Sequence, residues 1–99
     1  MMNENNGYVI IPTTTSKKEL KKYKKQPLKL GKIQEIVGIL NEKGFEGIPK
    51  NKKPHSLVGN YKDCYECHIE PDLLIIWKQY EEDKVIVLER LGSHSELFS

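Results

Sequence analysis

Residues 64–77, CYECHIEPDLLIIW, carry the clearest hydrophobic pattern of the chain. The first part of this stretch alternates, as a β-strand with one buried face does. Its apolar face is expected to carry Tyr65, Cys67 and Ile69, and its polar face Cys64, Glu66, His68 and Glu70. After Pro71-Asp72, the unbroken apolar run 73–77 predicts a second strand that is buried on both faces.

Shorter patterns predict one strand and one helix near the N-terminus. Residues 8–12 are typical of a short strand, and Pro12 either ends it or places it at a sheet edge. Ser16 and Glu19 have the spacing of a capping box, in which each residue bonds the backbone of the other. We therefore expect a Lys-rich helix from Ser16 to about Lys25.

The rest of the chain predicts a second helix, a long loop and a last strand. Apolar residues recur at steps of three and four over 28–43, so this helix is expected to cover the sheet and to stop at Gly44. Residues 45–60 predict a polar loop, and loops of that length are often functional. Residues 85–91 predict a strand that forms an antiparallel hairpin with the strand before it, and 94–98 a short tail.

The order strand, helix, helix and three strands predicts an α+β fold, with two N-terminal helices packed on a small, mostly antiparallel four-stranded sheet. At 99 residues the chain fits a single domain, 1–99. No window is apolar enough to cross a bilayer, and the N-terminus has no pattern of a secretory signal. We expect a cytoplasmic protein without a membrane contact.

Charge is distributed unevenly along the chain, although the formal net charge is only +2. Residues 1–62 carry 13 Lys and 5 acidic residues, whereas 63–99 carry 3 basic and 9 acidic residues. The Lys residues are densest over 17–32, and a second group, Lys50, Lys52 and Lys53, precedes His55. Such clusters suit a polyanion such as RNA, but from charge alone a solvated helix face is the simpler explanation.

Three histidines, His55, His68 and His94, suggest acid–base chemistry. Imidazole exchanges protons near neutral pH, so two or three such groups around one site supply a general base and a general acid. RNA provides its own nucleophile, the ribose 2′-hydroxyl, and its cleavage then needs proton transfer and stabilisation of charge on phosphorus. We assign Arg90 as the cation for that charge. Each histidine taken alone also fits a structural role, and Asp72 fits a simple turn residue.

Two metal patterns are weaker. Cys64-Tyr-Glu-Cys67-His68 matches the covalent haem motif, but the two sulfurs would point to opposite faces of a strand. The same residues lack the second pair that a four-ligand zinc site needs. We therefore expect no metal and no cofactor, with Cys67 as a buried apolar residue and Cys64 as a reduced surface thiol.

Three separated blocks also resemble a known family. HSLVG at 55–59, ECHIEPD at 66–72 and ERLGSHSELF at 89–98 are similar, in order and in spacing, to the signature of YafQ-type toxins in the RelE/ParE superfamily of bacterial toxin–antitoxin systems. The resemblance implies a RelE-like fold. It also implies a ribosome-dependent endoribonuclease, an mRNA interferase that cleaves mRNA in the aminoacyl site by 2′-hydroxyl attack. A co-encoded antitoxin is expected to hold it inactive, and operator DNA to be contacted only through the antitoxin complex.

The resemblance also implies roles for individual residues. The family's catalytic cluster falls on His55, His68, Asp72 and His94, with His94 as the expected general acid. Phe98 falls on an mRNA-contacting aromatic residue, and Glu66 on a functional acid. Tyr65 departs from the pattern, because many relatives carry Arg there. Stabilisation of phosphate charge is then expected from Arg90 and the lysines of 50–53, and Tyr65→Arg is expected to raise the cleavage rate.

Two other functions compete with this interpretation of the sequence. A ParE-like toxin binds DNA gyrase without cleaving RNA, and it has no need of a cluster of histidines. A plain RNA- or ribosome-binding protein would rely on the lysines of 17–32, and the loss of His94 would leave it active. An acidic segment of an antitoxin is another candidate ligand for these lysines.

Overall fold

The computed structural model describes residues 7–98. The strands are β1 (Val9–Pro12), β2 (His55–Ser56), β3 (Tyr65–Glu70), β4 (Leu73–Tyr80) and β5 (Val85–Gly92). The α-helices are α1 (Thr14–Lys21), α2 (Pro27–Lys43) and α3 (His94–Phe98). Three 3₁₀ turns, η1 (Gly44–Gly47), η2 (Lys50–Lys52) and η3 (Gly59–Tyr61), lie in the long connection between α2 and β3.

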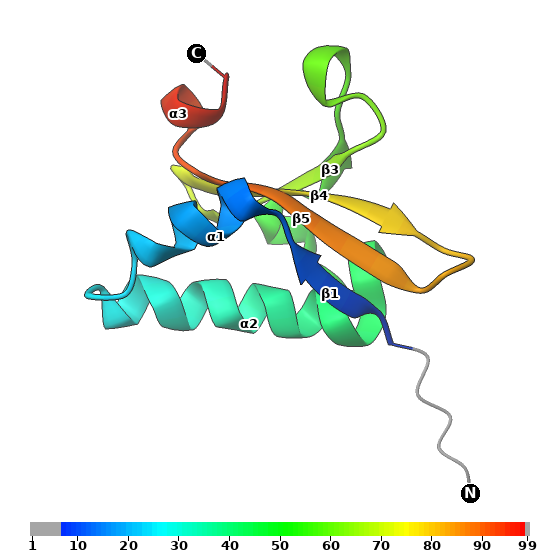
Figure 1. Ribbon diagram of the computed structural model, residues 1–99, viewed down its shortest axis with the longest axis horizontal. Coiled ribbons are helices and arrows are strands. Elements are labelled where there is room, and N and C mark those ends of the chain that lie inside the picture. The colour runs from blue at the N-terminus through cyan, green and yellow to red at the C-terminus, as the bar shows by residue number, and fades with distance from the viewer. Residues whose placement is uncertain (1–6, 99) are drawn as a thin grey trace, which may run out of the picture.

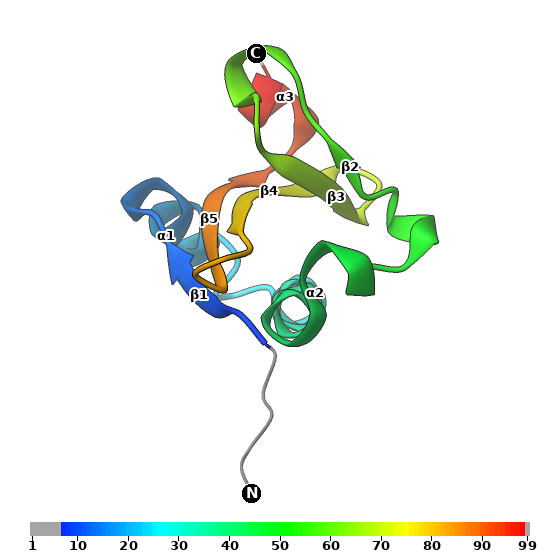
Figure 2. The ribbon, with the colours of Figure 1, turned by 90° about the vertical axis from the view of Figure 1, so that its right-hand side faces the viewer.

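The strands form one sheet in the order β1-β5-β4-β3-β2. Only the pair of β1 and β5 is parallel among the described strands, so the sheet is mostly antiparallel, as expected. Helix α2 lies on one face, and α3 lies on the other together with the loop that precedes β3 (Figures 1 and 2). The α+β class is confirmed, and β1 occupies the edge position that Pro12 indicated.

The expected count of four strands and the expected C-terminal tail were wrong. The fifth strand, β2, has two residues and pairs His55 with Glu66 and Ser56 with Tyr65. A strand of two residues shows no alternation, so it stayed hidden in the polar loop. Residues 94–98 form helix α3, which is too short to show helical periodicity.

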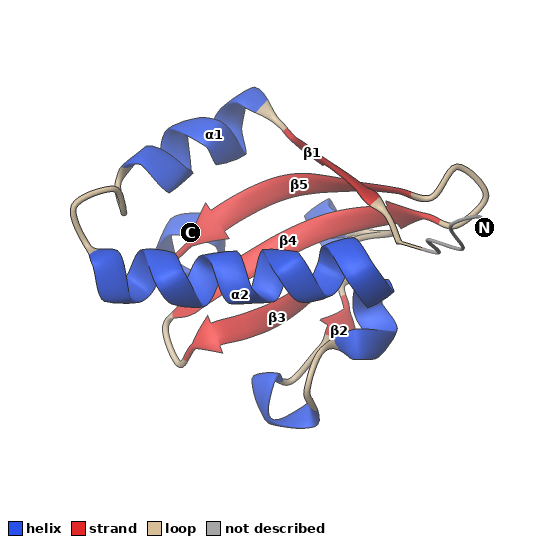
Figure 3. Ribbon diagram, turned by 90° about the horizontal axis from the view of Figure 1, so that it is seen from below, coloured by secondary structure: helices blue, strands red, loops and turns tan. Residues whose placement is uncertain are grey.

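Two apolar clusters lie on opposite faces of the sheet. The larger one packs α2 against the sheet through Ile33, Ile36 and Leu40, and Figure 3 shows α2 crossing this face. The smaller one joins Cys64, Leu74 and Ile76 to Leu97 of α3. Residues 73–77 of β4 are each at most 2% exposed, which confirms the strand buried on both faces.

Cys64 was expected at the surface, and this was wrong. Its side chain lies in the smaller cluster, and the residue is 3% exposed. The alternation of β3 did place Cys64 on the face opposite Cys67, but α3 and Tyr61 cover that face here. Burial raises the pKa of both thiols, that of Cys67 to about 12.

Helix α1 begins at Thr14, two residues before the predicted cap, Ser16. Its N-cap is Thr13, whose Oγ1 accepts a hydrogen bond from the amide of Ser16 at 3.0 Å. Ser16 lies inside the helix and is buried. The capping box of Ser16 and Glu19 was therefore wrong, and the carboxylate of Glu19 is left for another partner.

Helix α2 was predicted almost to its bounds. Pro27 occupies the first turn, where its fixed φ suits a helix start, and Gly44 caps the C-terminus with φ +66°. A Cβ at Gly44 would lie 2.7 Å from the ring of Tyr8, so packing requires glycine there as well.

Two β-bulges decide which side chains face α2. In β3 the pairing shifts between His68 and Glu70, and Glu70 consequently turns to α2, where Lys29 and Lys32 bind it at 2.5 and 2.9 Å. The polar-face position expected for Glu70 was wrong for this reason, because one extra residue reverses the alternation.

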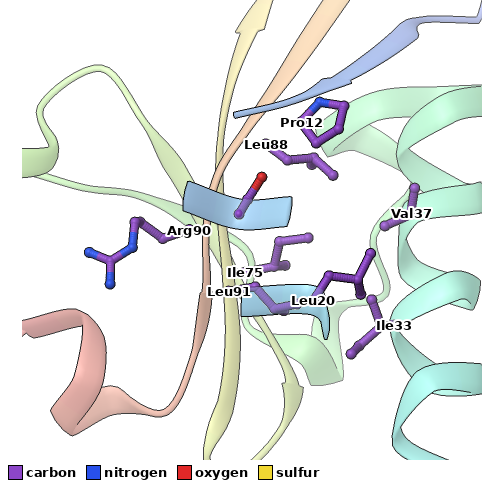
Figure 4. Close-up of a pocket in the computed structure, with 9 residues that line it drawn as sticks. Pro12, Leu20, Ile33, Val37, Ile75, Leu88, Arg90 and Leu91 are labelled. Carbon is purple, nitrogen blue, oxygen red and sulfur yellow. The ribbon is translucent and has the colours of Figure 1, made fainter. Parts of the chain in front are cut away.

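The second bulge lies in β5. Ile76 pairs with Arg90, but the next residue of β4, Trp77, pairs with Leu88. Leu88 therefore packs on the α2 side while Arg90 faces α3. Figure 4 shows the Arg90 side chain pointing away from an apolar pocket lined by Leu88 and its neighbours. No helix in the described range is long and apolar enough to cross a bilayer.

Candidate functional site

The sheet face that carries α3 brings several of the expected site residues into one row. Strand pairing aligns His55 with Glu66, Glu66 with Ile76, and Ile76 with Arg90. Directly opposed residues of antiparallel strands share a face, so these side chains lie on the same side of the sheet. In the neighbouring row, His68 is paired with Leu74.

Glu66 joins two histidines. Its Oε1 lies 3.3 Å from Nε2 of His55 and 3.9 Å from Nε2 of His68. The other nitrogen of His55, Nδ1, is 2.8 Å from the carbonyl oxygen of Lys53. His55 thus faces an oxygen at each ring nitrogen, which fixes the plane of its ring.

The carboxyl of Glu66 is an unusual buried group. The residue is 4% exposed, and its Oε2 has no hydrogen-bond partner within residues 7–98. Leaving a buried polar atom without a partner costs stability, about 1–3 kcal/mol. Such a cost is common at functional sites, where side chains are placed for chemistry.

A second group forms at α3. Oδ1 of Asp72, in the turn between β3 and β4, accepts a hydrogen bond from the backbone amide of His94 at 3.0 Å. Asp72 therefore holds the start of α3 and does not touch the His94 ring through this bond. The ring of His94 packs on that of Phe98, with centroids 4.9 Å apart, and Tyr61 meets Phe98 edge-on at 5.6 Å.

Arg90 does not present a free charge. Its Nε and one terminal nitrogen donate to Oε2 of Glu19, at 3.0 and 2.8 Å, and this bond raises the pKa of Arg90. The other terminal nitrogen donates to the hydroxyl of Tyr61 at 2.9 Å. Arg90, Tyr61 and Phe98 line an open cavity of about 320 Å³ beside α3.

Two lysines of the long connection, Lys52 and Lys53, lie near His68. Lys52 donates to the carbonyl of Ile69 at 3.1 Å and so ties η2 to β3. The ammonium groups of Lys50 and Lys53 make no bond within the described residues. Lys52, Lys53 and His68 line a second cavity of about 220 Å³.

Tyr65 lies outside this site. Its ring packs against Phe45, with centroids 4.5 Å apart, and against Trp77 at 5.9 Å, all on the α2 face. An Arg at this position would enter the apolar cluster and would not reach the histidines. The reason given for a faster Tyr65→Arg variant was therefore wrong.

The structure thus brings six of the predicted residues together in two groups, one at His55, Glu66 and His68 and one at Asp72, His94 and Phe98. Sequence reasoning missed the parts played by Glu19 and Tyr61. Glu19 was assigned to a helix cap, and Tyr61 stands in a polar loop without a periodic pattern. Within residues 7–98 no group of three or more His, Cys, Asp or Glu side chains is arranged to hold a metal ion.

Comparison with known proteins decides the family. Residues 8–99 match the model of a family described as the bacterial toxin of a type II toxin–antitoxin system, YafQ. The chain belongs to the YafQ family. An mRNA interferase toxin YafQ of Escherichia coli K12 is 31% identical over 81 residues, which cover 82% of this chain and 85% of that protein.

Solved structures agree with this placement. YafQ in the E. coli DinJ–YafQ toxin–antitoxin complex superposes with a TM-score of 0.80 at 28% identity, over 94% of this chain and 99% of that one. A metal-bound toxin from Helicobacter pylori gives a TM-score of 0.77 at 37% identity, over 92% of this chain and 99% of that one. This YafQ-family toxin therefore shares its fold and nearly its whole length with these proteins.

Proposed function

We propose that this YafQ-family toxin is a ribosome-dependent endoribonuclease that cleaves mRNA in the aminoacyl site. The observation that carries the proposal is the presence of two groups on one side of the sheet, His55 and His68 around Glu66, and His94 on α3, whose backbone amide is bound by Asp72. A cluster of imidazoles supplies acid and base together. The E. coli relative is named as an mRNA interferase.

In the proposed reaction a base removes the proton of the ribose 2′-hydroxyl. The 2′-oxygen attacks the adjacent phosphorus, the bond to the 5′-oxygen breaks, and an acid protonates that oxygen. His55 and His68 are the candidates for the base, because Glu66 fixes both. His94 is the candidate for the acid, since it is exposed on α3 and held by Asp72.

Charge on the phosphate needs nearby cations. Lys50 and Lys53 have ammonium groups without partners in the described part of the chain. Three of the five N–H groups of the Arg90 guanidinium donate hydrogen bonds to Glu19 and Tyr61, so two N–H groups are left to bind a phosphate. Phe98, 39% exposed and next to His94, offers a ring on which an unpaired base stacks.

No step of this reaction passes through a metal, because 2′-hydroxyl attack needs only proton transfer and charge stabilisation. The H. pylori relative is described as metal-bound, so the point can be tested. A chelator of zinc and copper that leaves Mg²⁺ for the ribosome is expected to leave the cleavage rate unchanged. A rate that falls with chelator and returns with added metal would contradict metal-independent cleavage.

A co-encoded antitoxin is the proposed protein partner, as in the E. coli complex. The exposed lysines of α1 suit an acidic segment, and an open apolar groove of about 470 Å³ lies between β1, α1 and α2. Operator DNA is proposed to be bound only through the complex.

Cleavage of a defined mRNA, on programmed ribosomes and as naked RNA, tests the proposal. The wild type is expected to cut only on the ribosome, within the aminoacyl-site codon, and His94→Ala is expected to lose at least about 100-fold in rate. Ser95→Ala is the matched control, since Ser95 is exposed on the same helix. If the wild type cuts in neither setting, ribosome-dependent cleavage is refuted, and inhibition of gyrase supercoiling is the next activity to measure.

A further inference from the structure

Outside the proposed catalytic groups, the side chain of Glu19 accepts three hydrogen bonds. It lies on α1, and its side chain is 10% exposed. Its Oε1 accepts the backbone amide of Leu91 at 2.8 Å, and its Oε2 accepts two N–H bonds of Arg90. One carboxylate therefore satisfies three donors of β5. These donors belong to Arg90 and Leu91, which lie just beyond Leu88, the last residue of β5 that pairs with β1.

Arg90 extends this connection to the other side of the sheet. It donates to the hydroxyl of Tyr61, and that hydroxyl donates to the carbonyl of Leu97 on α3 at 3.1 Å. The ring of Tyr61 also contacts the ring of Phe98, and the ring of Phe98 packs against that of His94. A continuous series of contacts thus runs from α1 to the proposed acid.

The chemistry of this series favours a positioning role. A guanidinium held by three bonds in a rigid fork loses the freedom that an exposed Arg keeps. The α3 helix has only five residues and is held mainly by its contacts, so its orientation depends on them. Lys22, the C-cap residue of α1, pairs with Glu96 of α3 at 3.5 Å, but this pair is exposed, and pairs of this kind contribute little.

We propose that Glu19 is a positioning residue for RNA cleavage, which fixes the Arg90 guanidinium and, through Tyr61, the orientation of helix α3. This inference rests on the proposed nuclease function. In it Glu19 touches neither the RNA nor the reacting atoms. Glu19 acts on the reaction indirectly, because it fixes the direction of the two remaining N–H groups of Arg90 and the position of the His94 ring.

Two variants interrupt the series at different points. Glu19→Gln replaces one acceptor oxygen by an NH₂ group, which must face a donor of Leu91 or Arg90. Tyr61→Phe removes only the hydroxyl between Arg90 and Leu97. Glu35→Gln is the matched control, since Glu35 is an exposed acid of α2 without a bond in the described range.

The readouts are the single-turnover cleavage rate on programmed ribosomes, the toxin concentration at half-saturation, and the fluorescence of Trp77 as a check on folding. Glu19→Gln is expected to lower the maximal rate about 10- to 100-fold while half-saturation stays within about threefold, because misplacing a catalytic group acts on the chemical step. Tyr61→Phe is expected to lower it about 3- to 10-fold, and Glu35→Gln to leave it within about twofold.

A double variant separates positioning from stability. If Glu19 acts through Arg90, Glu19→Gln/Arg90→Gln cleaves no more slowly than Arg90→Gln alone. The nuclear Overhauser contact between the rings of His94 and Phe98 is expected to weaken in Glu19→Gln and in Tyr61→Phe.

Three results would overturn the inference. A folded Glu19→Gln protein with the wild-type rate would do so, and so would additive losses in the double variant. If Glu19→Gln does not fold, a folded Tyr61→Phe protein that cleaves at the wild-type rate would overturn the inference instead. An inactive wild type removes the proposed nuclease function itself, and the wild-type arm therefore distinguishes the two failures.

Discussion

Replacing Glu66 with methionine is expected to stabilise the fold and to abolish cleavage. Glu66 is 4% exposed, and one of its two oxygens lacks a partner within residues 7–98. Its strand neighbour on the same face, Ile76, is apolar and fully buried. Methionine is unbranched, similar in length and adaptable, so it fills the same space without a polar atom.

The expected change in the free energy of unfolding of Glu66→Met is the sum of two opposing contributions. Removing a buried oxygen without a partner is worth about 1–3 kcal/mol. Losing the contact with His55, whose side chain is 48% exposed, costs at most about 1 kcal/mol, since pairs with an exposed member are weak. The free energy of unfolding is expected to rise by about 1 kcal/mol or somewhat more, which raises Tm by about 4–8 °C in a domain of this size.

Equilibrium unfolding in urea measures this change. Trp77 is the single tryptophan and is 0% exposed, so its fluorescence reports the whole transition. The midpoint is expected to rise at an unchanged m-value, while the cleavage rate falls at least about 100-fold because the two histidines lose their common anchor. Glu35→Met, on the exposed face of α2, is the control without a stability gain. A free energy that falls by more than about 1 kcal/mol would refute the reasoning.

Three further changes test other parts of the structure. Gly38→Ala on α2 is expected to stabilise the protein by up to about 1 kcal/mol in urea unfolding, because a Cβ there meets no atom within 4 Å; a loss would contradict open space at this position. Cys64 and Cys67 are expected to resist iodoacetamide in the native protein, since burial raises the pKa of both thiols, and rapid labelling without unfolding would count against their burial. Glu70, whose pKa the hydrogen bonds of Lys29 and Lys32 lower to about 2 from 4.5, stabilises the folded state above pH 4.5 and loses this effect as pH falls toward 2. The stability difference between wild type and Glu70→Gln should shrink over that range, and acid titrations followed by circular dichroism that stay parallel would contradict it.

Elements with a long period were predictable from sequence. The apolar repeat of 28–43 gave α2 to within one residue at its start, and the run 73–77 gave a strand buried on both faces. These patterns extend over many residues, and burial imposes them directly. The alternation of β3 likewise placed Cys67 and Ile69 in the larger cluster correctly.

Features set by a single residue were not predictable. The bulge in β5 inserts Glu89, and only this insertion turns Arg90 away from α2. No residue type marks the bulge, because Glu89 fits an ordinary strand position as well. The same holds for β3, where the bulge sends Glu70 to the lysines of α2.

Polar contacts between residues far apart in the sequence were also not predictable. Ser16 and Glu19 have the spacing of a capping box, yet Thr13 caps the helix and Glu19 bonds Arg90, 71 residues away. A local motif and a distant partner compete for the same carboxylate, and local spacing cannot reveal the partner. The sequence suggested that His55 and His68 share a site, but the contact of His55 with Glu66 depends on β2, which the sequence did not show.

We propose that this toxin cleaves mRNA by attack of the ribose 2′-hydroxyl, with side chains of β2, β3 and α3 on one side of the sheet as base and acid. The most direct measurement uses programmed ribosomes that carry an mRNA with a single 2′-deoxy nucleotide at the position of the cut. The all-RNA message is expected to yield a 5′ product that ends in a 2′,3′-cyclic phosphate and a 3′ product that begins with a 5′-hydroxyl. The deoxy message is expected to stay intact at that bond. Cleavage of the deoxy message at the same bond would contradict the account, because it would require a nucleophile other than the 2′-hydroxyl.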